Sequence, residues 1–201
     1  MHQSAGSSFL MDLECKKEAI LEAEARFAKA MGAAVIEKPT VNFWMVLIPI
    51  LFLHFIYRMK KYREGRAKFD MDFMVSRKLA MDAALEAVSS GNPPDILDIA
   101  KTARVSDEIK KPYIVWMGVL VDHYMDLMRA HGGGFASLVR SAYGNRENYL
   151  LTLNRLESVE REFYNAIKPH LSATAGAVEI ITAIETQSRI FRRDLAQEIF
   201  S

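Results

Sequence analysis

The chain has 201 residues, a formal net charge of +1 and a single cysteine, Cys15. A nearly neutral chain has no overall attraction for nucleic acid, so we expect no nucleic-acid partner. One cysteine cannot form a disulfide within the chain, and it excludes a zinc site built from several thiolates. Before Cys15 the longest apolar run is Phe9-Leu10-Met11, too short for a cleaved signal peptide, so we expect a membrane segment further along to stay in the mature protein.

Residues 1–40 predict an amphipathic helix from about Ser8 to Ile36, followed by a short linker at residues 37–40. Apolar residues recur three, four or seven positions apart, which is typical of one helix face, although Lys17 and Glu24 interrupt it. The face consists of Leu10, Leu13, Ile20, Phe27, Met31 and Ala34. It needs a partner surface, and the sequence leaves three open: the membrane, the chain's own bundle or another subunit.

Residues 41–59 predict a single transmembrane helix. From Phe43 to Tyr57 every residue is apolar or aromatic except Pro49 and His54. About nineteen helical residues span roughly 28 Å, close to the hydrocarbon thickness of a bilayer. Pro49 keeps two alternatives open, a buried hairpin and a helix lying in the membrane interface.

Aromatic and basic residues flank this segment as membrane interfaces require. Trp44 lies near one end and Tyr57 at the other, where aromatic belts form. Six basic residues follow, opposed only by Glu64, and we expect them to contact lipid headgroups: Arg58, Lys60, Lys61, Arg63, Arg66 and Lys68. The positive-inside rule then predicts a single-pass protein of the plasma (inner) membrane, with the C-terminal domain in the cytoplasm and the first forty residues on the opposite side.

The remaining sequence predicts an all-α protein. Residues 60–90 continue as a basic juxtamembrane rod helix, which ends at a Ser/Gly/Asn/Pro loop before residue 95. Residues 91–201 predict a multi-helix bundle that packs with residues 69–90, because no stretch alternates with the period of a strand. Tyr113–Val121 is apolar on all sides and predicts a core helix with Trp116 and Leu120 buried.

Two groups of charged residues follow in this bundle. Asp122, His123 and Asp126 end the apolar stretch, where they could bind a metal or supply a general base, or form the solvated end of the helix. A di-iron bundle requires Glu-x-x-His pairs, which the sequence lacks, so we predict no metal and no cofactor. Further on, acidic and basic residues alternate and predict a solvated face with local ion pairs: Arg155, Glu157, Glu160, Arg161 and Glu162.

His54 is the candidate cofactor-binding residue, because an imidazole deep in a membrane segment usually faces protein. It could bind haem, contact a quinone, relay protons, or simply be tolerated near the interface. We favour an interhelical hydrogen bond that docks the anchor onto another membrane subunit, which makes Trp44, Pro49, His54 and Tyr57 the anchor and docking residues.

The function that we predict is therefore a non-catalytic, membrane-anchored helical subunit. It docks to a larger membrane complex or recruits a soluble partner, so its partners are membrane lipid and other protein subunits. The alternatives are a helical subunit that binds haem, quinone or metal, and a membrane-anchored helical regulator.

Overall fold

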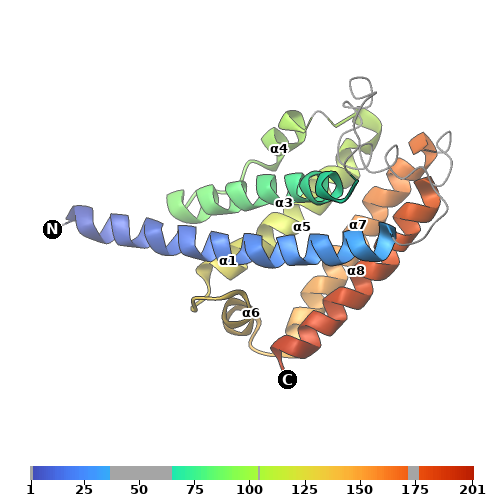
Figure 1. The fold of residues 1–201 in the computed structure, drawn as a ribbon. Coiled ribbons are helices and arrows are strands. Elements are labelled where there is room, and N and C mark those ends of the chain that lie inside the picture. The colour runs from blue at the N-terminus through green and yellow to red at the C-terminus, as the bar shows by residue number, and fades with distance from the viewer. Residues whose placement is uncertain (1, 37–64, 104, 172–176) are drawn as a thin grey trace.

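The computed structural model of the chain describes residues 2–36, 65–103, 105–171 and 177–201. Within these ranges the chain forms helices and no strands, which confirms the all-α prediction (Figure 1). The helices are α1 (His2–Ile36), α3 (Gly65–Ser90), α4 (Ile96–Thr102), α5 (Asp107–Arg129), α6 (Phe135–Tyr143), α7 (Arg146–Leu171) and α8 (Ala177–Ile199).

The predicted transmembrane helix, residues 41–59, lies outside the described residues, and with it Trp44, Pro49, His54 and Tyr57. The same holds for four of the basic residues, Arg58, Lys60, Lys61 and Arg63. Arg66 and Lys68 fall in the first turn of α3. Among the helices that the structure describes, none is both long and apolar enough to cross a membrane.

Helix α1 packs into the bundle, against α3 and α8 (Figure 1). Its predicted apolar face is buried there, with Leu13, Ile20 and Met31 each at most 1% exposed. Of the three partner surfaces that the sequence left open for this helix, the one observed is the chain's own bundle. The helix begins at His2 and not near Ser8, and its first turns extend beyond the other helices, so Leu10 is exposed.

Helix α5 is the central element, and it contacts α1, α3, α4, α6 and α7. Acidic residues begin it, which suits the positive end of a helix dipole. Trp116 and Leu120 are 2% and 1% exposed, so both predicted core residues are confirmed. The Trp116 ring stacks on Phe163 of α7, with 4.9 Å between the ring centroids. Val115, at 42% exposed, shows that one side of this apolar stretch faces outward.

The loop after α3 falls at the Ser/Gly/Asn/Pro cluster that predicts it, and a second turn follows α6. Gly91 follows α3 and Gly144 follows α6, each with a positive φ near 75° that glycine adopts without strain. Helix α7 contains Pro169 in its last turn and ends at Leu171. It then pairs with α8, and these two long helices form one side of the bundle (Figure 1).

Replacing Trp116 by Ala should lower the free energy of unfolding by about 3–5 kcal/mol, because the ring leaves a cavity beside Phe163. Replacing its exposed neighbour Val115 by Ala should change it by less than about 0.5 kcal/mol. Denaturant unfolding in mild detergent, followed by circular dichroism, measures both. Equal stability of the two variants would place Trp116 on the surface.

Candidate functional site

Four charged side chains from four helices meet in the interior and form the charge network: Glu24 of α1, Arg77 of α3, Glu160 of α7 and Arg192 of α8. Arg192 donates two hydrogen bonds to Glu160, at 2.6 Å and 2.9 Å. Arg77 Nε donates to Glu24 at 2.7 Å, and its Nη2 lies 3.6 Å from Glu160 Oε1. The charges thus alternate in sign along a chain that links the four helices.

Two aromatic residues complete the charge network. The guanidinium carbons of Arg77 and Arg192 lie 5.8 Å and 5.6 Å from the centroid of the Phe27 ring, within the range of a cation–π interaction. The Tyr124 hydroxyl of α5 donates to Glu24 Oε1 at 2.8 Å. Five helices are therefore joined by polar contacts that are buried or partly buried.

The electrostatics of the charge network favour the ionised forms of Glu160 and Arg192. Burial acts to raise the pKa of Glu160, but the charge and hydrogen bonds of Arg192, with Arg77, outweigh it and hold the pKa below its ordinary value. Burial acts to lower the pKa of Arg192, but Glu160 more than compensates and raises it. Two carboxylates and two guanidiniums sum to zero formal charge, which is the condition for charges to stay in an apolar interior.

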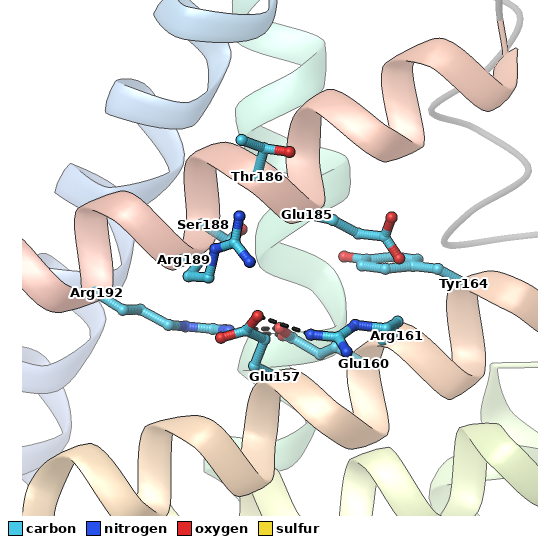
Figure 2. A pocket seen from close by; sticks show the side chains of 9 residues that line it. All are labelled: Glu157, Glu160, Arg161, Tyr164, Glu185, Thr186, Ser188, Arg189 and Arg192. Carbon is cyan, nitrogen blue, oxygen red and sulfur yellow. Dashed lines mark hydrogen bonds and ion pairs between the residues drawn. The ribbon is translucent and has the colours of Figure 1, made fainter.

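A pocket of about 210 Å³ lies beside the charge network, between α7 and α8 (Figure 2). Its lining is polar and includes Tyr164, Glu185 and Arg189 as well as Glu160 and Arg192. Glu160 and Arg192 already bond to each other, so neither is available as an acid, a base or a metal ligand. The pocket can hold water or a small polar group.

The three candidate residues at the end of the apolar stretch do not converge. His123 is buried, whereas Asp122 and Asp126 are exposed on α5. Adjacent positions on a helix point about 100° apart, which separates the imidazole from Asp122. Throughout the part of the chain that the structure describes, no three His, Cys, Asp or Glu side chains are grouped as a metal site requires.

His123 instead belongs to an aromatic cluster. Its Nδ1 lies 2.6 Å from the Tyr143 hydroxyl, a hydrogen bond between α5 and α6. The rings of Tyr143 and Tyr149 stack near the imidazole, at centroid distances of 5.8 Å and 6.3 Å. Burial lowers the pKa of His123 to about 4; Glu24 opposes this and Arg192 adds to it. The imidazole is therefore neutral at pH 7.

The charge network was missed by sequence reasoning. Glu160 was assigned to a solvated face, and this prediction is wrong, because the residue is 4% exposed. A signal was present: Glu160 continues the spacing of the buried residues Leu153, Leu156 and Phe163. Glu24 likewise interrupts the apolar face of α1. A single charged residue on an otherwise apolar helix face indicates a buried ion pair. The sequence does not show which residue is its partner.

Comparisons of the chain with models of known families, with curated proteins and with solved structures give no match.

Replacing Glu160 by Gln should lower the free energy of unfolding by about 3–5 kcal/mol, because it leaves Arg77 and Arg192 buried with one carboxylate between them. The matched control is Glu157→Gln one turn earlier, whose partner Arg161 is exposed, and this should cost less than about 1 kcal/mol. Denaturant unfolding compares them. Similar losses in both variants would show that the charge network contributes no more than a surface pair.

His123 should make the protein less stable in mild acid. Its pKa is lowered from 6.5 to about 4 on folding, so its contribution is complete above about pH 6.5 and is lost as the pH falls toward 4. The full loss is about 3 kcal/mol. The melting temperature should therefore fall between pH 7 and pH 5. His123→Gln should flatten this dependence, whereas His170→Gln, at an exposed position, should leave it unchanged.

Proposed function

We propose that the protein is a non-catalytic, membrane-anchored helical subunit whose bundle holds or recruits another protein. The observation that carries this proposal is the charge network. Three of its four charges, Arg77, Glu160 and Arg192, are buried, and the four bond to one another and to Tyr124, so they join helices. Ion pairs and hydrogen bonds that hold helices in one register are typical of a scaffold protein.

The physics of buried ion pairs supports a role in alignment. Well-packed apolar residues of similar volume are often as stabilising as a buried ion pair, so such a pair is weak evidence for stability alone. It does penalise misaligned packing, because each displaced helix leaves a buried charge unpaired. For this bundle the result is a single rigid arrangement of α1, α3, α7 and α8, which suits a surface that another protein recognises.

The membrane part of the proposal rests on the sequence. Residues 41–59 are long and apolar enough to enter a bilayer, with Trp44 and Tyr57 near the ends. The basic run that follows favours anionic headgroups and a cytoplasmic bundle at the plasma (inner) membrane. We expect no cofactor and no nucleic acid to take part.

Fractionation and purification from native membranes test this function. The protein should float with membranes in a density gradient, and replacing residues 41–59 by a Gly/Ser linker should release it. Purified in mild detergent, it should retain a protein subunit in fixed stoichiometry, identified by mass spectrometry, and no chromophore or stoichiometric metal. A bound haem or quinone would favour the cofactor-binding alternative.

His54→Ala should loosen the association with a membrane partner by about 1 kcal/mol, roughly a fivefold change in affinity, because interhelical hydrogen bonds in membranes are worth about that much. The bundle should stay folded. Leu53→Ala is the matched control next to it in the segment and should weaken binding less. Loss of a visible haem spectrum in His54→Ala, with assembly intact, would contradict the docking role.

A further inference from the structure

The two helices that flank the predicted anchor are antiparallel and in a fixed register. Lys17 of α1 lies 2.9 Å from Asp82 of α3, and further along α1 Glu24 bonds to Arg77, which lies earlier in α3. Residue numbers therefore rise along one helix as they fall along the other. In Figure 1 the two helices run side by side.

This register brings the flanks of the anchor together. Ile36, the last residue of α1, follows Glu24 by twelve residues, and Gly65, the first residue of α3, precedes Arg77 by twelve. Because both helices rise 1.5 Å per residue, these two ends lie at the same level of the bundle. The chain leaves the bundle and returns to it at one end.

We infer that α1 and the rest of the bundle lie on the same side of the membrane, and that this end of the bundle faces the lipid surface. The inference rests on the proposed anchoring by residues 41–59. It replaces the single crossing expected from the sequence, since a segment whose flanks lie on one side crosses an even number of times or not at all.

Separation of α1 from the bundle would be costly. Leu13, Ile20 and Met31 would lose their buried positions, each now at most 1% exposed. Arg77, 3% exposed, would lose Glu24 as its hydrogen-bonded carboxylate. Removing one partner from a buried ion pair is among the more destabilising changes that a fold can suffer. A topology with the first forty residues on the far side would need both losses.

The length of the connection sets how far it reaches. Residues 37–64 number twenty-eight, whereas two helical crossings need about forty. A double helical crossing therefore does not fit in this length of sequence.

Two residues of the basic run belong to the described part of the chain, at this end of the bundle. Arg66 and Lys68 belong to the first turn of α3, at the level where the chain returns from the membrane. Basic residues close to a bilayer are attracted to anionic headgroups, each by about 1 kcal/mol. The partner of this end of the bundle is therefore an anionic lipid surface.

Cysteine labelling of the full-length protein tests the inference. Cys15 is exposed on α1 and is the only cysteine in the sequence, so it reports the side on which α1 lies. The double variant Cys15→Ser, Ser201→Cys carries its thiol at the exposed C-terminal residue and reports the side of the bundle. Both are treated, in sealed membrane vesicles of one orientation, with a membrane-impermeant maleimide before and after addition of detergent.

The two proteins should be labelled to the same extent before detergent, either both fully or both scarcely, and both fully afterwards. Labelling of one and protection of the other would mean opposite sides and would overturn the inference while leaving the anchoring intact. Flotation of the same vesicles separates the two proposals. Protein that fails to float would overturn the anchoring itself, and the inference with it.

Discussion

Glu160 lies between two buried arginines from different helices, and the pairing of charges in the interior depends on it. It accepts two hydrogen bonds from Arg192 and lies 3.6 Å from Arg77, which in turn bonds to Glu24. A carboxylate in that position compensates two buried positive charges, and each of those charges belongs to a different helix. The arrangement of α1, α3, α7 and α8 pairs all four groups, and displacing one of these helices would separate a pair.

The charge network also explains which aromatic residues surround it. Phe27 lies within cation–π distance of both guanidinium groups, so its ring contributes packing and a favourable electrostatic face at once. On the other side of the core, Trp116 stacks on Phe163, which follows Glu160 by three residues in α7. The apolar core and the charge network are thus one packed unit, and a change in either affects the other.

Sequence periodicity predicted the helices and their buried faces well, because both depend on residues close together in the chain. Trp116 and Leu120 were found this way. It could not pair Glu24 with Arg77 or Glu160 with Arg192, since partners 53 and 32 residues apart leave no local pattern. The sequence also suggests one site for Asp122 and His123, because the two residues are adjacent in the chain. In the structure they lie on the outer and inner sides of α5.

The same limit explains the membrane topology expected from the sequence. The positive-inside rule compares the charges on the two sides of an apolar segment, and it assumes that the two flanks are independent of each other. Here they are not, because Glu24 precedes the segment, Arg77 follows it, and the two are hydrogen-bonded in the interior. A direct contact between α1 and α3 is stronger evidence that both lie on one side of a membrane than the charge difference between them is evidence for opposite sides. The charge network therefore links the two helices that flank the predicted anchor, together with α7 and α8.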